Sequence, residues 1–198
     1  MDLPERLDRS FYARPVLVVA RELLGMRLVR ILDGHRLAGI IVETEAYRGQ
    51  EDLACHARAG LTKRTAVMFG PPGHAYVYFT YGMHWLLNCI TDTEGYPAAV
   101  LLRAILPTDG VNAIAAQRAG RPKKQWTNGP AKLTQSLSVD GRWNGHDLCA
   151  SQQDEDQALF IERGAAVPDE RIHASPRVGL GKTPEPWLSM PWRFVVQH

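Results

Sequence analysis

The chain has 198 residues, of which 45% are hydrophobic and 22% are charged, and these values are ordinary for a globular protein with one buried core. They exclude a disordered chain, and no apolar run reaches the roughly 18 to 20 residues of a membrane span. The formal net charge of +2 permits an anionic partner without requiring one. No basic segment followed by an apolar one opens the chain, so no secretory signal is indicated. We expect one domain over residues 1–198, located in the cytoplasm.

The chain contains three cysteines, Cys55, Cys89 and Cys149. Their number is odd, their spacing is wide and no Cys-x-x-Cys pair occurs, which argues against a disulfide framework and against a structural zinc site. His56 follows Cys55 directly, but no second pair at ligand spacing accompanies them. We therefore expect reduced thiols and no metal.

The N-terminal part of the chain predicts a helix followed by a β-hairpin. The helix covers residues 14–24, with Pro15 at the first helical position and Gly25 beyond its end. Two apolar-rich runs, residues 26–32 and 36–42, then flank an Asp-Gly pair. An Asp-Gly pair between such runs is a strong signal for a tight hairpin turn.

Residues 40–47, Ile-Ile-Val-Glu-Thr-Glu-Ala-Tyr, continue the second strand of this hairpin. Successive side chains of a strand point to opposite faces, so Glu43, Glu45 and Tyr47 share one face. Two carboxylates on a largely apolar strand are costly to bury unless other groups pair with them. The alternative is that the strand emerges into solvent and both glutamates are simply hydrated.

A second hairpin is predicted from residues 74–80 and 83–90, which flank a Tyr-Gly turn. Tyr76 and Tyr78 lie on one face of its first strand, where core tyrosines with satisfied hydroxyls are the simpler interpretation. Tyr81 occupies the turn itself. Because a hairpin tip has little core to join, Tyr81 needs another explanation.

Residues 98–106 form a nearly continuous apolar run that contains Arg103 as its one charge. An unpaired buried guanidinium is costly, so Arg103 needs an acidic partner. Glu43 and Glu45 are the obvious candidates.

Two segments of the chain are basic and loop-like. Residues 48–65 predict a loop with one helical turn that carries Arg58, Lys63 and Arg64, and residues 120–127 form a second basic loop. An Asn-Gly-Pro sequence then opens a helix with Lys132 in its first turn. A cation there opposes the helix dipole, so it either meets a phosphate or extends into water.

The remaining signals are a helix at residues 110–119 and short strands at 158–162, 177–180 and 192–196. Together the elements predict an α+β fold: a mostly antiparallel, curved β-sheet with flanking helices and a protruding β-hairpin.

Carboxylates flanked by aromatic rings suit cleavage of a glycosidic bond, where an acid or base acts beside an oxocarbenium-like centre. Basic loops suit phosphate contacts, and an aromatic turn tip can insert between bases and bend a duplex. Both features combine in one activity, the removal of a base from DNA after that base has been flipped out of the helix.

The sequence resembles the alkyladenine (3-methyladenine) DNA glycosylases found in mammals and many bacteria. The matching runs follow the family order across nearly the whole chain, which makes a chance match very unlikely compared with a single short motif. These runs are residues 39–47 (GIIVETEAY), 51–56 (EDLACH), 75–83 (AYVYFTYGM), 86–88 (LLN), 100–104 (VLLRA), 129–133 (GPAKL) and 177–181 (RVGLG).

The resemblance implies a monofunctional enzyme without metal or organic cofactor. Glu45 is then the general base that activates water, and Arg103 helps to hold the water and the carboxylate. The remaining roles implied by the resemblance are as follows: a base pocket made of Tyr47, His56, Tyr78 and Asn88; intercalation and minor-groove contact by Tyr81, Gly82 and Met83; and DNA backbone contacts by Arg58, Lys63, Arg64 and Lys132.

The implied partner is double-stranded DNA that carries damaged purines, bound by a monomer without membrane association. One alternative is a non-catalytic protein that binds damaged DNA and forms no abasic product. A second is a glycosidase for free carbohydrates that uses Glu43 and Glu45 as a carboxylate pair, but this reading leaves the basic loops and Tyr81 unexplained.

Overall fold

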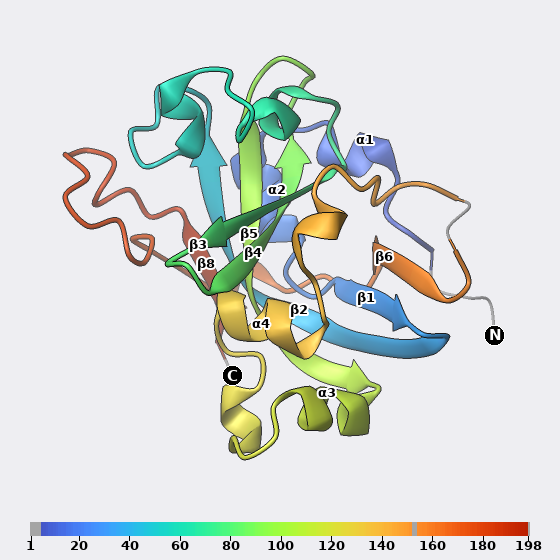
Figure 1. The fold of residues 1–198 in the computed structure, drawn as a ribbon. Helices are drawn as coiled ribbons and strands as arrows, with labels where there is room; N and C mark the ends of the chain where they lie inside the picture. The colour runs from blue at the N-terminus through green and yellow to red at the C-terminus, as the bar shows by residue number, and fades with distance from the viewer. Residues whose placement is uncertain (1–4, 152–153, 198) are drawn as a thin grey trace.

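The computed structural model describes residues 5–151 and 154–197. Its strands are β1 (Arg27–Leu32), β2 (His35–Arg48), β3 (Ala75–Thr80), β4 (His84–Thr91), β5 (Ala98–Asp109), β6 (Gln157–Glu162), β7 (Ile172–Ser175) and β8 (Arg193–Val196). Six of them lie side by side in the order β3-β4-β5-β2-β1-β6, with every neighbouring pair antiparallel. β8 pairs with both β2 and β7 and so forms a branch of the same sheet (Figure 1).

Short helices flank this sheet. They are α1 (Arg9–Tyr12), α2 (Val16–Glu22), α3 (Val111–Gln117) and α4 (Pro130–Ser136), with 3-10 turns η1 (His56–Ala59), η2 (Ala66–Phe69), η3 (Lys123–Gln125), η4 (Gly141–Trp143) and η5 (Asp169–Arg171). The expected α+β fold, with a mostly antiparallel sheet and flanking helices, is confirmed. Among the described residues, no helix has both the length and the hydropathy needed to cross a membrane.

Helix α2 attaches the N-terminal segment to the middle of the sheet. Its apolar side buries Val16, Val19 and Ala20, and the Ala20 carbonyl accepts a hydrogen bond of 2.7 Å from the Thr44 hydroxyl on β2. The sequence pattern predicts Pro15 as the first helical residue. In the structure Pro15 is instead the N-cap, one residue before the helix begins. The buried hydroxyl of Thr44 thus finds a partner, while its neighbours on β2 face the other side of the strand.

Both predicted hairpins are present. In the first, Asp33 and Gly34 have φ of 51° and 73°, the left-handed pair that a two-residue primed turn requires. In the second, Tyr81 and Gly82 have φ of 52° and 66°. An added Cβ at Gly82 would meet nothing within 4 Å, so this second turn ends in open space.

Strand β2 is the longest strand and the one on which the fold converges. It pairs with β1 at one end, with β5 along most of its length and with β8 at residues 43–45. The pairing with β5 shifts register at three points, two of which flank Glu43. Extra residues in a strand increase its local twist and redirect side chains, and here they lie beside the two glutamates.

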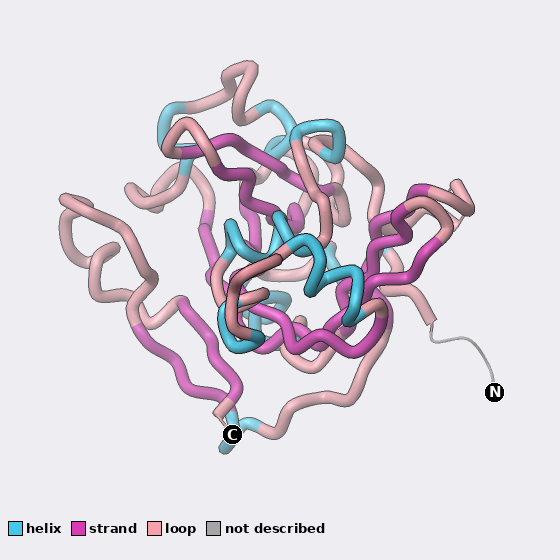
Figure 2. Tube along the Cα trace, turned by 60° about the horizontal axis from the view of Figure 1, so that its bottom comes forward, coloured by secondary structure: helices cyan, strands magenta, loops and turns pink. Residues whose placement is uncertain are grey.

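One predicted strand is wrong and another was missed. Residues 177–180 form an irregular loop. Gly179 and Gly181 have φ of 78° and 59°, so the backbone here is not extended and does not pair with a neighbouring strand. The strand in this region is β7, whose short and mostly exposed sequence lacks the apolar alternation that marks a strand. Figure 2 shows the segment between β7 and β8 as a long loop on one side of the molecule.

Replacing Gly25 with alanine is expected to destabilise the fold more than the same change at Gly120. Both glycines have positive φ, 88° and 74°, so both variants carry the cost of about 1–2 kcal/mol for a left-handed residue. At Gly25 the new Cβ would also collide with the Ala165 carbonyl, whereas Gly120 faces open space, and such overpacking adds about 1–3 kcal/mol. Urea unfolding measures both free energies. Equal losses would contradict the close approach at Gly25.

Candidate functional site

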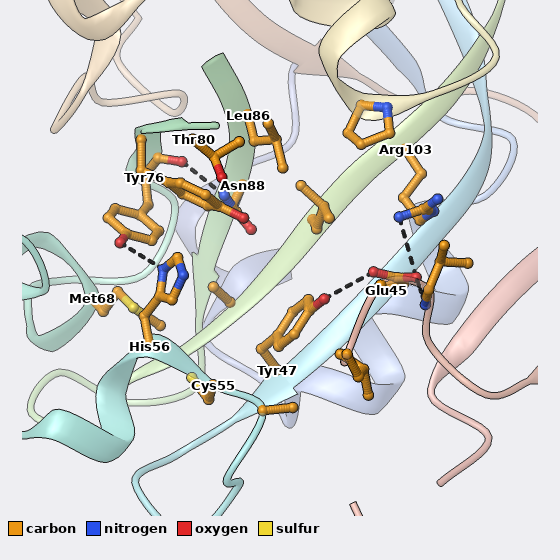
Figure 3. Close-up of a pocket in the computed structure, with 18 of the residues that line it drawn as sticks. Glu45, Tyr47, Cys55, His56, Met68, Tyr76, Thr80, Leu86, Asn88 and Arg103 are labelled. Atoms are coloured by element: carbon orange, nitrogen blue, oxygen red, sulfur yellow. Dashed lines mark hydrogen bonds and ion pairs between the residues drawn. The ribbon is translucent and has the colours of Figure 1, made fainter. Parts of the chain in front are cut away.

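A cavity of about 450 Å³ lies between the sheet, the loop around η1 and the loop at residues 178–183 (Figure 3). It brings together residues from β2, β3, β4 and β5 with the Tyr81 turn. Eight of the residues singled out from the sequence line it: Glu45, Tyr47, His56, Arg58, Tyr78, Tyr81, Asn88 and Arg103. One end of the cavity is charged and the other is aromatic.

Glu45 forms the charged end, and its side chain is fully buried. Three donors reach its two oxygens. The Tyr47 hydroxyl donates to Oε2 at 2.9 Å, the Val178 backbone N–H donates to Oε1 at 2.7 Å, and an Arg103 guanidinium nitrogen lies 3.2 Å from Oε1. These partners offset the cost of removing a carboxylate from water, so the hydrated alternative for this residue is excluded.

Arg103 lies between the two glutamates of β2, as its place in an apolar strand predicts. Its Nε donates to Glu43 Oε1 at 2.7 Å while its other edge faces Glu45. Burial of Arg103 lowers the pKa of its guanidinium, but Glu45 and Glu43 together raise it above its usual value. Burial likewise raises the pKa of Glu43, yet hydrogen bonds from Arg193 and Arg103 bring it below its usual value. Arg103 and Glu43 are therefore both charged at neutral pH.

The aromatic end of the cavity is built around His56. Its ring packs edge-on against Tyr78, with centroids 4.5 Å apart, and its Nδ1 lies 3.1 Å from the Tyr76 hydroxyl. Burial, and then the positive charges of Arg64 and Arg58, lowers the pKa of His56 to about 4. The imidazole is therefore neutral at physiological pH. Tyr76 is only 2% exposed, as the core interpretation expects, but it also lines the cavity beside Tyr78.

Asn88 forms part of the wall that β4 contributes. It is buried, and its side-chain nitrogen donates to the Tyr76 carbonyl at 3.0 Å across the β3–β4 ladder. That bond restricts the amide to one orientation beside the cavity (Figure 3).

The tip of the β3–β4 hairpin carries exposed apolar side chains at the mouth of the cavity. Tyr81 is 81% exposed and Met83 is 66% exposed. A second, smaller cavity of about 240 Å³ lies between this tip and the start of α4, lined by Tyr81, His84 and Lys132 among others. Large apolar side chains left in water indicate a surface that contacts another molecule.

Three of the four basic residues singled out from the sequence lie beside one of the two cavities or against a ring that lines one; they are Arg58, Arg64 and Lys132. Arg58, Lys63 and Arg64 are exposed on the loop that carries His56, and the Arg64 guanidinium lies 5.3 Å from the centre of the Tyr78 ring. Lys132 donates to Asn128 at 2.8 Å and lines the second cavity. Unlike Arg58, the other three do not line the larger cavity.

Sequence reasoning missed the ion pair that holds the loop at residues 177–180. Arg177 and Asp52 are both fully buried and form a two-pronged pair, with one contact at 3.0 Å. The guanidinium also lies 4.7 Å from the centre of the Tyr47 ring. Because Arg177 is held there, the next N–H in the chain, that of Val178, reaches Glu45. Residues 177–181 are one of the runs that resemble the glycosylase family. No local sequence pattern indicates, however, that Arg177 pairs with Asp52.

The three cysteines are free thiols, as expected. Among the described residues, no three His, Cys, Asp or Glu side chains cluster in a way that could hold a metal ion.

Comparisons with known proteins agree on one family. The sequence model of the methylpurine-DNA glycosylases matches residues 10–198. A protein of Carboxydothermus hydrogenoformans named "Putative 3-methyladenine DNA glycosylase" is 48% identical over 97% of this chain and 95% of its own length. Proteins with the same name from Methanocella arvoryzae and Myxococcus xanthus are 49% and 45% identical, over 95% and 96% of this chain and 90% of their own lengths.

Replacing Asp52 with asparagine is expected to cost about 3–5 kcal/mol of unfolding free energy, because it leaves the buried Arg177 guanidinium without its counter-charge. The control is Asp169→Asn, which breaks the surface ion pair with Arg21 and is expected to cost less than about 1 kcal/mol. Chemical denaturation of the two variants measures the difference. A small loss for Asp52→Asn would show that the buried pair does not hold the loop.

Proposed function

We propose that this chain, which belongs to the methylpurine-DNA glycosylase family, is a DNA repair enzyme. Its proposed reaction is hydrolysis of the N-glycosidic bond of alkylated or deaminated purines in duplex DNA. The observation that carries this proposal is the buried Glu45 carboxylate, held by three donors at one end of a cavity with tyrosine and histidine rings at the other. The proposed substrates are 3-methyladenine, 7-methylguanine, hypoxanthine and ethenoadenine.

In this proposal Glu45 is the general base. As the bond between the sugar C1′ and the purine breaks, the bonding electrons leave with the purine and positive charge develops on the sugar. Glu45 takes a proton from a water molecule whose oxygen bonds to C1′, which leaves an abasic site. Arg103 holds the carboxylate in place. Water is the nucleophile and no amine attacks the sugar, so no strand cleavage follows.

The aromatic end of the cavity would receive the flipped base. Tyr47 and Tyr78 offer ring faces to a planar purine, and stacking is strongest for the electron-poor rings of alkylated bases. His56 is neutral and so adds no charge that would repel a cationic base. Asn88, held by the Tyr76 carbonyl, would narrow the pocket against the exocyclic amine of guanine.

The mouth of the cavity would contact the duplex. Tyr81 would fill the gap that the flipped nucleotide leaves, with Gly82 and Met83 beside it in the minor groove. The basic residues around the mouth would contact backbone phosphates; they are Arg58, Lys63, Arg64 and Lys132. The proposal includes action as a monomeric single domain, because one chain and one sheet supply the whole described set of residues. Action in the cytoplasm is a further part of the proposal.

Glu45→Gln is expected to keep binding to lesion-containing DNA and to lower the single-turnover rate of base release by about 10²–10⁴-fold, the usual contribution of a general base. The shape of the side chain is preserved and only its basicity is lost. Release of 3-methyladenine, hypoxanthine or ethenoadenine from a defined duplex measures the rate, with Glu170→Gln, an exposed glutamate on η5, as the control.

Two outcomes of this assay would decide against the proposal. Undiminished base release by Glu45→Gln would remove Glu45 from the mechanism. Failure of the unmodified protein to form an abasic site with any damaged purine, while it still binds the duplex, would favour the non-catalytic damage-binding protein.

Tyr81→Ser is expected to weaken binding to lesion DNA by about tenfold or more, since one base–aromatic stacking contact is worth about 1–3 kcal/mol. Binding to undamaged DNA should change less, because no base is flipped there. Val18→Ser, which removes an apolar side chain exposed on α2, is the matched control. Fluorescence anisotropy with labelled duplexes measures both affinities, and an unchanged affinity for lesion DNA would exclude an intercalating role.

A further inference from the structure

Glu43 receives two arginines on one oxygen atom. The Nε of Arg103 on β5 and the Nε of Arg193 on β8 each lie 2.7 Å from Glu43 Oε1. The β2–β8 register sets Arg193 directly across from Glu45. Its guanidinium also lies 3.3 Å from the Ser175 hydroxyl on β7, so both strands of the sheet branch hold Arg193 in place.

These contacts fix the orientation of Arg103. Its Nε edge is held by Glu43 and a terminal nitrogen by Glu45, so the planar guanidinium is restrained at two points. An arginine side chain has many rotamers in solution, and a single contact to Glu45 would leave the guanidinium plane free to rotate. Glu43 therefore acts on Arg103, and through it on Glu45.

The charges of this group balance only when Arg193 is counted. Glu43 and Glu45 contribute two negative charges and Arg103 contributes one positive charge, which leaves an excess negative charge beside a carboxylate with no exposed surface. Excess charge in such a site is costly. Arg193 supplies the missing positive charge through its contact with Glu43.

We infer that Glu43 and Arg193 are positioning residues for the reaction: Glu43 orients Arg103 against Glu45, and Arg193 balances the charge of Glu43. This inference rests on the proposed function and assigns a role to the carboxylate that the proposed mechanism leaves unused. Neither residue lines the cavity, so Glu43 acts through Arg103 and Arg193 acts through Glu43.

Besides Glu43 on β2 and Arg193 on β8, four titratable or charged groups lie around Glu45. They are Tyr47 on β2, Arg103 on β5, Tyr78 on β3 and Arg177 in the loop before Val178. Only the charges of Glu43 and Arg193 are varied, so a change in pH dependence reports on those two.

The test is the pH dependence of single-turnover excision of 7-methylguanine, a cationic base whose departure needs no added proton. Excision is expected to fall at low pH, because a general base acts only in its unprotonated form. Arg193→Met leaves an excess negative charge that favours proton uptake, so the acidic limb is expected to move to higher pH by about one unit, the size of shift that a nearby charge produces. Glu43→Gln leaves an excess positive charge and is expected to move the limb to lower pH.

The double variant Glu43→Gln/Arg193→Met restores the balance of charge, so its acidic limb is expected to return close to that of the unmodified protein. Its rate on the pH plateau should stay below that protein's, because Arg103 has lost one of its two restraints. Arg193→Lys keeps the charge and should keep the position of the limb. The control is Arg163→Met, which removes a surface partner of Glu5 and should leave the profile unchanged.

Circular dichroism and urea unfolding establish that each variant is folded before its profile is compared. The inference would be overturned if the acidic limbs of the two single variants moved in the same direction or did not move. A purely structural role would lower the rate or the stability without shifting the two limbs in opposite directions. Such a result would leave the proposed function intact as long as the unmodified protein releases the damaged base and Glu45→Gln lowers that rate. Failure of the unmodified protein to release any damaged purine would refute the proposed function instead.

Discussion

The burial of the Glu45 carboxylate is the constraint on which the rest of the site depends. A carboxylate without exposed surface is stable only if donors replace the water it has lost, and here those donors come from three separate segments: Tyr47 on its own strand, Arg103 on β5 and the backbone of Val178. Each donor must itself be held in place, and neighbouring strands and ion pairs of the fold do this.

The sheet topology explains how so many partners reach one side chain. β2 is long enough to pair with β1, β5 and β8 at different points along its length. Its pairing with β5 places Arg103 beside both glutamates, and its pairing with β8 brings Arg193 to Glu43. The loop before β8 returns over the site because Arg177 is held by the buried Asp52. The polar end of the cavity is therefore held by contacts from several strands and one loop, as the preorganised base of our proposal requires.

The aromatic end follows a different rule. The rings of Tyr78 and His56 pack edge-on, and burial keeps the imidazole uncharged, so this part of the cavity offers shape and polarisable surface to a bound group and little charge. The exposed Tyr81 and the basic loop lie at its mouth. The buried ion pairs thus gather at one end of the cavity and the aromatic rings at the other, with Arg58 and Arg64 beside those rings.

The sequence by itself determined what depends on neighbouring residues. The Asp-Gly and Tyr-Gly turns, the strands with alternating side chains, and the need of Arg103 for an acidic partner all follow from local pattern and the cost of burying charge. The resemblance added roles, such as the choice of Glu45 over Glu43, that periodicity leaves open because both residues share one face. Only the tertiary structure decided that the segment at 177–180 is a loop, that Arg177 meets Asp52, and that Arg193 meets Glu43. These pairs are 125 and 150 residues apart in the chain, and no local pattern records which distant side chains the fold will bring together.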